Sequence, residues 1–253
     1  MQVQTVFQRY ELKYMLTKEQ KDRMLEQMQD RLVPDPYGDS TVRSLYFDTD
    51  TYRLARRSIE RPVYKEKLRI RSYHRAAPED EVFVELKKKY QSVVYKRRLA
   101  AGEQAAMEWL AGGTCPVTGQ IADEITYFRG YYETLKPVVF VSYDRQAFYS
   151  ERDPDLRISF DENIRSRTDG LSLTEEPGGE RLIPEDRVMM ELKTAGGLPL
   201  WLVHFLTENR IYKTSFSKYG TAYQRQIFHA GGAGGYIPAG SGAYNRREGM
   251  AYA

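Results

Sequence analysis

The stretch Lys65–Arg98, KEKLRIRSYHRAAPEDEVFVELKKKYQSVVYKRR, decides the fold, because its charged residues fall on every second position. Side chains of a β-strand alternate between two faces. One face of the first strand therefore carries Lys65, Lys67, Arg69 and Arg71. The other face carries Leu68 and Ile70. After a polar turn at 78–80 the alternation resumes, with Val82, Val84 and Leu86 opposite Phe83, Glu85 and Lys87. The stretch predicts a hairpin with one apolar and one strongly cationic face.

Alternating segments outside the hairpin predict further strands. They span 7–15, 42–48, 92–99, 137–149, 156–161 and 187–193. The word Glu-Leu-Lys recurs at 11–13, 85–87 and 191–193, each time within a predicted strand. Each copy places a carboxylate and an ammonium on one face and turns the leucine away. The repetition predicts that several strands share a face of mixed but mainly positive charge.

Helical spacing predicts the elements between the strands. Thr17–Gln20 has the form of a capping box, followed by a helix of about four turns that Pro34 and Pro36 end. An apolar stripe predicts a second long helix over 120–135. Shorter helices are expected over 102–110, 201–206 and 217–228. Residues 49–58 are compatible with a loop or a short helix, and 169–185 form a polar connection.

Two architectures would accommodate these strands. An antiparallel sheet with one solvated face explains any single strand. Because nearly every predicted strand has a charged face, we favour a sheet that closes on itself with that face inward. The predicted fold class is α+β: a closed antiparallel β-barrel of about eight strands with helices packed outside. Residues 1–229 would form this single domain, and the Gly- and Ala-rich residues 230–253 a flexible tail.

A barrel interior crowded with cations predicts a large anionic ligand, because like charges repel in a partly desolvated space. A chain of phosphates suits guanidinium groups, which bind phosphate oxygens bidentately. Carboxylates beside a polyanion are repulsive unless they hold a divalent metal, and Mg²⁺ or Mn²⁺ is bound by one or two carboxylates plus phosphates. We expect Glu191 to be that ligand, and Glu11 and Glu85 to pair with neighbouring cations.

Composition narrows the class of protein. The net charge of the 253 residues is +3, which predicts no particular partner. The single cysteine, Cys115, favours a reducing, cytoplasmic compartment, and no apolar run is long enough to span a membrane. The run Lys87–Lys89 is no nucleic-acid patch, because Lys88 would point away from its neighbours. We therefore expect neither a nucleic-acid partner nor a membrane segment in this chain.

An ordered set of motifs resembles a known family. The stretches are FQRYELKYML, SLYFDT, KLRIRSY, FVELKKK, YKRR, VSYDRQAFY, RISFDENIR, VMMELKT and SFSKYG, over about residues 5–228. Together they resemble the polyphosphate-polymerase (VTC) domain of the triphosphate tunnel metalloenzyme, or CYTH-like, superfamily. The resemblance implies an antiparallel tunnel that binds nucleoside triphosphate and polyphosphate with a divalent metal, Mn²⁺ or Mg²⁺.

The resemblance also implies roles for individual residues. The phosphate-binding set would be Lys13, Arg69, Arg71, Lys87, Tyr143, Arg145, Arg157, Lys193, Ser217 and Lys218, joined by Lys96 or Arg97. The alternation of faces along the strand does not decide between Lys96 and Arg97. Glu191 would hold the metal. The residues expected to act on the transferring phosphoryl group are Arg69, Arg71, Arg145, Arg157 and Glu191.

Three functions follow in rank order. The first is an ATP-dependent polyphosphate polymerase, with ATP and polyphosphate as partners and association with a membrane-protein subunit left open. The second is a triphosphatase on the same tunnel. It ranks lower because Arg9 stands where the hydrolytic members commonly carry the first glutamate of a glutamate–x–glutamate–x–lysine pattern. The third is a non-catalytic polyanion-binding module.

Overall fold

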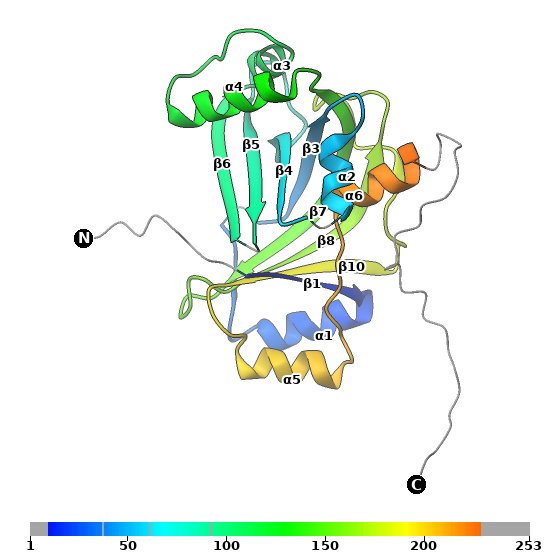
Figure 1. Ribbon diagram of the computed structural model, residues 1–253. Coiled ribbons are helices and arrows are strands. Elements are labelled where there is room, and N and C mark those ends of the chain that lie inside the picture. The colour runs from blue at the N-terminus through cyan, green and yellow to red at the C-terminus, as the bar shows by residue number, and fades with distance from the viewer. Residues whose placement is uncertain (1–9, 37, 61, 92, 229–253) are drawn as a thin grey trace, which may run out of the picture.

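A single curved antiparallel sheet forms the body of the protein. The computed structural model describes residues 10–228 except positions 37, 61 and 92, so the predicted tail 230–253 lies outside the described residues. Eight strands follow each other in the order β1-β10-β8-β7-β3-β4-β5-β6 (Figure 1). Their bounds are β1 Tyr10–Thr17, β3 Ser40–Asp48, β4 Tyr64–Ser72, β5 Glu81–Tyr90, β6 Val93–Gly102, β7 Lys136–Tyr149, β8 Arg157–Arg167 and β10 Arg187–Thr194. Two short strands, β2 (Val33–Pro34) and β9 (Glu180–Arg181), pair with β7 and β8.

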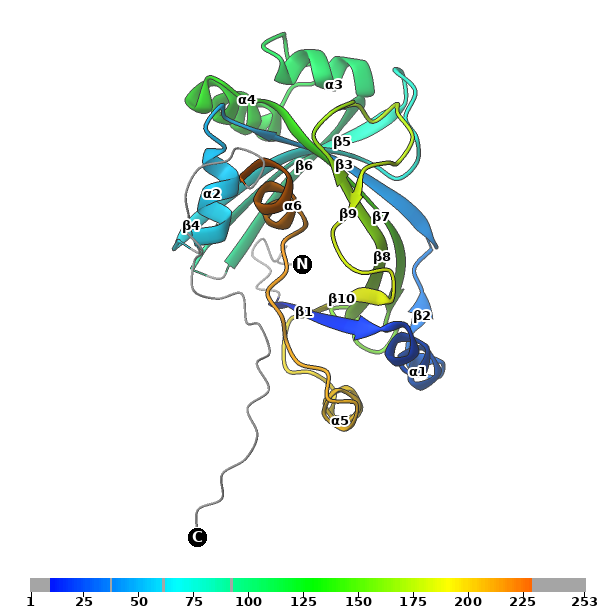
Figure 2. The same ribbon diagram turned by 90° about the vertical axis from the view of Figure 1, so that its right-hand side faces the viewer.

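The sheet is antiparallel as predicted, but hydrogen bonds do not close it into the expected barrel within the described residues. Among the described residues the hydrogen-bonded path begins at β1 and ends at β6, with no ladder between these two strands. Other contacts cross the gap: Lys87 of β5 forms an ion pair with Glu11 of β1 at 3.1 Å. On the free edge of β1, Thr214 N donates to Lys13 O at 2.7 Å. In Figure 2 the chain then rises from β1 toward α6 across this side of the sheet.

Helices lie where the sequence periodicity predicts them. The bounds are α1 Lys18–Met28, α2 Arg53–Glu60, α3 Glu103–Leu110, α4 Gln120–Tyr132, α5 Leu200–Glu208 and α6 Lys218–Ala222, which continues as a π-helix over Tyr223–Phe228. The capping box is present: Thr17 accepts from Gln20 N, and the Gln20 side chain accepts from Thr17 N. The segment 49–58 resolves into a turn followed by α2. The Asp48 carboxylate accepts from the backbone N–H groups of Thr49, Leu54 and Ala55.

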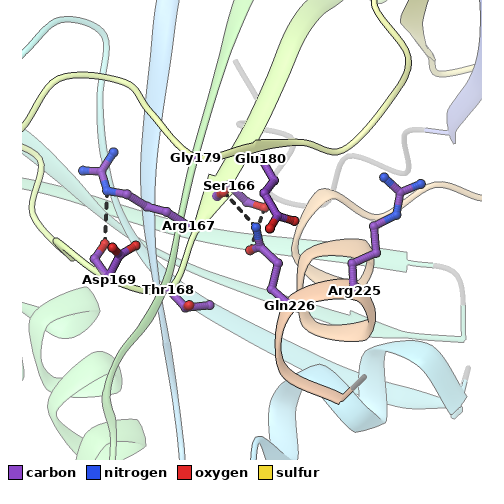
Figure 3. A pocket seen from close by; sticks show the side chains of 8 residues that line it. All are labelled: Ser166, Arg167, Thr168, Asp169, Gly179, Glu180, Arg225 and Gln226. Atoms are coloured by element: carbon purple, nitrogen blue, oxygen red, sulfur yellow. Dashed lines mark hydrogen bonds between the residues drawn. The ribbon is translucent and has the colours of Figure 1, made fainter. Parts of the chain in front are cut away.

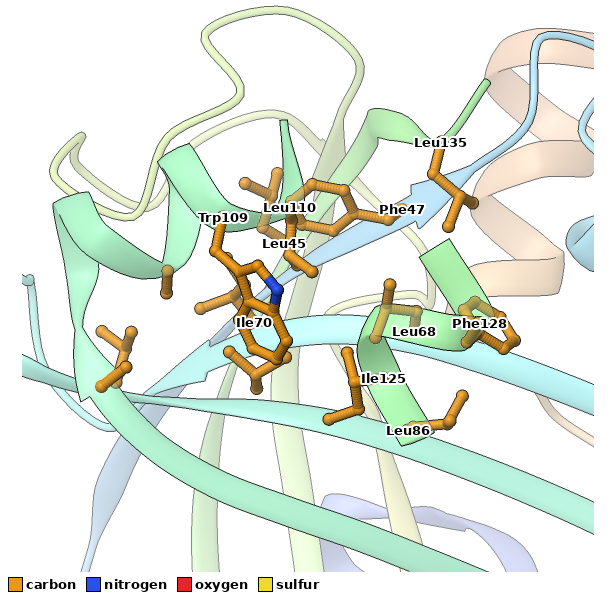
Figure 4. Close-up of a cluster of buried hydrophobic side chains, with 14 of the residues drawn as sticks. Leu45, Phe47, Leu68, Ile70, Leu86, Trp109, Leu110, Ile125, Phe128 and Leu135 are labelled. Carbon is orange, nitrogen blue, oxygen red and sulfur yellow. The ribbon is translucent and has the colours of Figure 1, made fainter. Parts of the chain in front are cut away.

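Two apolar cores pack helices against the convex face of the sheet. One lies under α3 and α4 and joins Trp109 and Ile125 to the hairpin residues Leu68, Ile70 and Leu86 (Figure 4). The other lies under α1 and α5, around Met24, Ile158, Met190, Leu192 and Leu202. The apolar positions of the strands therefore face outward into helices, as the alternation predicts. The charged positions are left on the concave side.

The concave side is not polar throughout. A third core fills part of it, where Tyr219, Ala222 and Tyr223 pack on sheet residues that include Tyr46 and Met189. The rings of Tyr219 and Tyr46 stack with centroids 4.6 Å apart, and Tyr219 donates to Asp48 at 2.5 Å. Thus α6 and the π-helix occupy one part of the concave side, and the charged residues keep the rest.

No helix among the described residues is long and apolar enough to cross a membrane.

Candidate functional site

Charged side chains from seven strands and the start of α6 meet on the remaining part of the concave side, which we call the charged face. Antiparallel neighbours that lie opposite each other point the same way. The register pairs Lys13 with Glu191, Arg69 with Glu85 and Arg145 with Asp161. Among the described residues, eight cations of this face lie within ion-pairing distance of four carboxylates. The carboxylates are Glu11, Glu85, Asp161 and Glu191. The cations are Lys13, Arg69, Arg71, Lys87, Lys96, Arg98, Arg145 and Lys218.

Glu85 is the centre of the cluster on the hairpin. Its side chain is 1% exposed, and its Oε2 accepts hydrogen bonds from Nε and Nη2 of Arg69, at 2.8 and 2.6 Å. Lys96 Nζ lies 2.6 Å from the other carboxylate oxygen, and Arg98 and Arg71 approach to 3.6 and 4.0 Å. Burial would raise the pKa of Glu85, but Arg69, Arg71 and Lys96 outweigh it and hold the pKa well below its usual range. One ionised carboxylate thus serves four cations.

Asp161 and Glu191 form a second cluster on β8 and β10. The fully buried Asp161 accepts a bidentate pair from Arg145, at 2.6 and 2.7 Å, and contacts Lys218 Nζ at 2.5 Å. Glu191 lies 3.3 Å from Arg145, 3.4 Å from Lys13 and 3.5 Å from Lys218. Burial opposes ionisation of Glu191, yet Lys218, Lys13 and Arg145 lower its pKa well below the usual value. Glu191 is therefore a carboxylate, the form that a metal ligand requires.

Two tyrosines place the arginines. Tyr46 OH accepts from Arg69 Nη1 at 3.0 Å, and Tyr143 OH accepts from Arg71 Nη2 at 3.1 Å. Lys218 Nζ also stands 4.3 Å from the centre of the Tyr143 ring. Burial would raise the pKa of Tyr46, but Arg69 and Arg71 leave it lowered. The phenolic oxygens thus act as acceptors that fix guanidinium groups next to the carboxylates.

The structure gathers the residues named from the sequence, with one exception. Lys13, Arg69, Arg71, Lys87, Lys96, Tyr143, Arg145, Glu191, Ser217 and Lys218 all contribute to the contacts of this face. Lys193 and the exposed Arg157 share their side of the sheet by register. Arg97 does not: it pairs with Leu86 across the ladder and donates to Glu124 of α4 at 2.9 Å. Its prediction as a phosphate-binding residue is corrected in favour of Lys96, because Arg97 faces the outer helices.

Sequence reasoning assigned no role to several members of the face, including Arg98, which lies 3.6 Å from Glu85. Asp161 and Tyr46 were assigned no part in the site. Period-two spacing puts Asp161 on the same face as Arg157, and the ladder puts Tyr46 opposite Arg69. Lys67 was placed on the cationic face of its strand but given no role. The available signal was its spacing of two residues from Arg69.

The donor set suits a hard divalent cation only in part. No cluster of three or more His, Cys, Asp or Glu side chains that could hold a metal occurs among residues 10–228 outside positions 37, 61 and 92. However, Lys13 Nζ sits between Glu11, at 3.5 Å, and Glu191, at 3.4 Å. The two carboxylates therefore already share one cation. Mg²⁺ and Mn²⁺ are commonly held by one or two carboxylates with phosphates completing the shell, so these residues fit a metal that arrives with a phosphate ligand.

Two open cavities are lined mainly by residues outside the charged face. One, of about 450 Å³, is lined by residues of β8, the following loop and the π-helix, including Ser166, Arg167 and Gln226 (Figure 3). There Gln226 donates to Ser166 O and accepts from Ser166 Oγ, both at 2.9 Å. The other, of about 370 Å³, touches Arg145 and is otherwise lined mainly from β3, β7 and β8. Neither gathers the clustered cations of the charged face.

Comparison with known proteins identifies the family. The profile of the VTC domain matches residues 8–227, which is most of the chain. The chain therefore belongs to the VTC domain family. No curated protein matches it at a significant level.

One solved structure shares the fold, and a second is more weakly similar. A candidate adenylate cyclase from Bacillus halodurans superposes with a TM-score of 0.53 and 17% identity, over 88% of this chain and 97% of that one. A candidate adenylyl cyclase from Hippeastrum, described as having a dominant triphosphatase activity, gives a TM-score of 0.47 and 16% identity, over 90% and 97% of the two chains. At this identity the first of these similarities concerns the fold alone.

Proposed function

We propose that this protein is an ATP-dependent polyphosphate polymerase that works on the charged face with a divalent metal. One observation carries the proposal: eight clustered cations share four carboxylates, so the face retains a large excess of positive charge. Such an excess in a partly desolvated place favours a polyanion over a singly charged metabolite. Membership of the VTC domain family supports the same class of ligand.

Phosphoryl transfer needs positioning and charge neutralisation rather than a side-chain nucleophile. A terminal oxygen of a polyphosphate chain would attack the γ-phosphorus of ATP in line. A new P–O bond forms, the bond to the β,γ-bridging oxygen breaks, and ADP leaves with that electron pair. Arg69 and Arg71 from the hairpin and Arg145 from β7 would hold the non-bridging oxygens, where negative charge is spread in the transition state.

The metal would be held by Glu191, with Glu11 as the second carboxylate. When bound, such an ion neutralises phosphate charge and aligns phosphate oxygens. The chain's own part is to keep both carboxylates ionised. Burial would raise the pKa of Glu11, but Lys87 outweighs it, with help from Lys13, and lowers the pKa to about 2.

A triphosphatase is the second candidate function. The observation that favours it is the pair of carboxylates Glu11 and Glu191 around one cation, since an ion held there would also serve a water nucleophile. The polymerase ranks first because Arg9 stands where the hydrolytic pattern carries its first glutamate. A non-catalytic module ranks third.

One assay separates these functions. The pure protein is incubated with ATP and Mn²⁺, and the products are resolved by length. Long phosphate chains with ADP are expected; orthophosphate without chains would support hydrolysis, and tight polyphosphate binding without turnover would leave the binding module. Glu191→Gln should lower turnover by about a hundredfold or more, and the requirement for metal should shift to higher concentration. Normal turnover of this variant would overturn the metal assignment.

A further inference from the structure

Lys67 differs from the other clustered cations of the charged face. It lies in β4, two residues before Arg69, and therefore points to the same side. Its Nζ donates to Ser217 Oγ at 3.0 Å. Within the part of the chain that the structure describes, no carboxylate lies within ion-pairing distance of Lys67, whereas each of the eight cations described above has one.

The charged groups around Lys67 are cations from every strand near it. Lys13 faces it from β1, Lys87 from β5, and Lys65 and Arg69 from its own strand. The carboxylate of Glu11 is nearby but is engaged by Lys87 at 3.1 Å and Lys13 at 3.5 Å. The segment before α6 contributes the neutral hydroxyl of Ser217. Lys67 itself has no counterion among these like charges, which is unfavourable, so an anion added at this point would relieve repulsion.

The hydroxyl next to Lys67 is fixed in place. Ser217 caps α6 by accepting from Gly220 N at 3.1 Å. Ser217 Oγ thus accepts two hydrogen bonds, one from Lys67 and one from Gly220, so the hydroxyl proton of Ser217 points away from both donors. Lys67 and Ser217 together therefore present an ammonium group and a hydroxyl donor to one region, which is a suitable pair for phosphate oxygens.

We propose that Lys67 is a phosphate-binding residue of this protein. The phosphate oxygen that it binds would lie where β1, β5 and the segment before α6 meet. The inference rests on the proposed function, because a phosphate chain must occupy the charged face. It adds a subsite on the open side of the sheet, next to the start of α6.

Proton uptake follows from this placement. Burial, and then the charges of Lys13 and Lys87, lower the pKa of Lys67 well below its ordinary value. A phosphate beside the amine favours the charged form and raises that pKa again. At pH values above the pKa of the empty protein, binding of the polyanion therefore draws a proton onto Lys67.

The test is titration calorimetry with tripolyphosphate as the probe. Lys67→Gln should weaken binding by about ten- to a hundredfold, the value of one hydrogen bond to a charged group. The matched control is Lys88→Gln, which removes the same charge from the adjacent strand; Lys88 lies opposite Glu66 on the convex side. The control should bind within about twofold of the parent. Because the substitution at Lys67 relieves repulsion, the melting temperature of the empty variant should equal or exceed that of the parent.

Lys67→Arg supplies the second readout. Guanidinium stays charged at all accessible pH values, so this variant should retain affinity but take up fewer protons than the parent, as measured in two buffers of different ionisation heat. Protons taken up by tripolyphosphate itself are the same for both proteins, so they cancel in the difference in proton uptake between the parent and Lys67→Arg. Unchanged binding by Lys67→Gln, with the parent binding well, would overturn this inference alone. Failure of the parent to bind tripolyphosphate would overturn the proposed function and this inference with it.

Discussion

The hairpin wall, formed by β4 to β6, and the opposite wall, formed by β1, β7, β8 and β10, balance their charges differently. On the hairpin wall Arg69, Arg71, Lys96 and Arg98 share the single carboxylate Glu85. The opposite wall sets Asp161, Glu191 and Glu11 against Lys13, Arg145 and Lys218. The excess positive charge therefore lies on the hairpin wall. The comparison teaches that the two walls offer different groups: the hairpin wall presents mainly cations, whereas the opposite wall presents carboxylates and cations together.

Removal of Glu85, the carboxylate that pairs with the hairpin cations, should have the largest effect. Glu85→Gln leaves four cations without a counterion, and breaking a buried ion cluster from one side costs about 3–5 kcal/mol. We expect a lower free energy of unfolding in urea and partial recovery when tripolyphosphate is added. Glu124→Gln is the matched control, because Glu124 pairs with Arg97 on the outer surface. Equal stability of the two variants would contradict the division of charge between the walls.

Loss of one arginine from each wall tests whether the phosphate chain contacts both. Arg69→Gln and Arg145→Gln each remove a guanidinium held by a carboxylate. Each should lower the rate of product formation by about a hundred- to a thousandfold, the usual cost of one charge-stabilising donor. The measurement is the initial rate at saturating ATP and Mn²⁺. If one variant keeps the parent's rate, the reacting phosphate touches only the other wall.

Acid should weaken the opposite wall through Glu11. Its pKa falls from the ordinary 4.5 to about 2 on folding, so its contribution to stability is complete above pH 4.5 and is lost as pH falls toward 2. The side chain is 26% exposed, which limits the contribution to about 2 kcal/mol. Unfolding in urea at several pH values should show a smaller acid loss for Glu11→Gln than for the parent. Parallel curves for the two proteins would contradict the lowered pKa.

The smallest effect should come from the outer face. Arg97→Gln breaks a half-exposed pair with Glu124 and should cost less than about 1 kcal/mol of stability, with no change in turnover. Lys96→Gln, one residue away, removes a cation 2.6 Å from Glu85 and should reduce turnover. Turnover assays on the two variants check the face assignment, and equal losses would contradict it.

Alternation along the hairpin predicted its faces because a strand has a period of two that any charged run reveals. Leu68, Ile70 and Leu86 are buried under helices, as that pattern requires. The same pattern could not decide between Lys96 and Arg97, because three consecutive basic residues fit either parity. It also could not reveal that the sheet stays open between β1 and β6. Closure depends on curvature and on contacts such as Lys87 with Glu11, which join positions far apart in the sequence.

The alternation of residues also could not predict that α6 and the π-helix fill part of the concave side. Tyr219 and Tyr223 look like ordinary helix residues in the sequence, and their contact with Tyr46 exists only once α6 has crossed the open side. Asp161 was overlooked for a related reason. Its importance comes from Lys218, which reaches it from 57 positions later in the chain.

The four carboxylates of the charged face make the protein behave as an ion exchanger. Arg69, Lys96, Arg145 and Lys218 already hold counterions before any substrate arrives, so folding does not wait for phosphate. At these four cations an incoming polyanion would have to displace internal partners, whereas at Lys67 it would meet no carboxylate from the described part of the chain. The affinity for the polyanion would then be a difference between two sets of ion pairs, and the return of the carboxylates would favour its release.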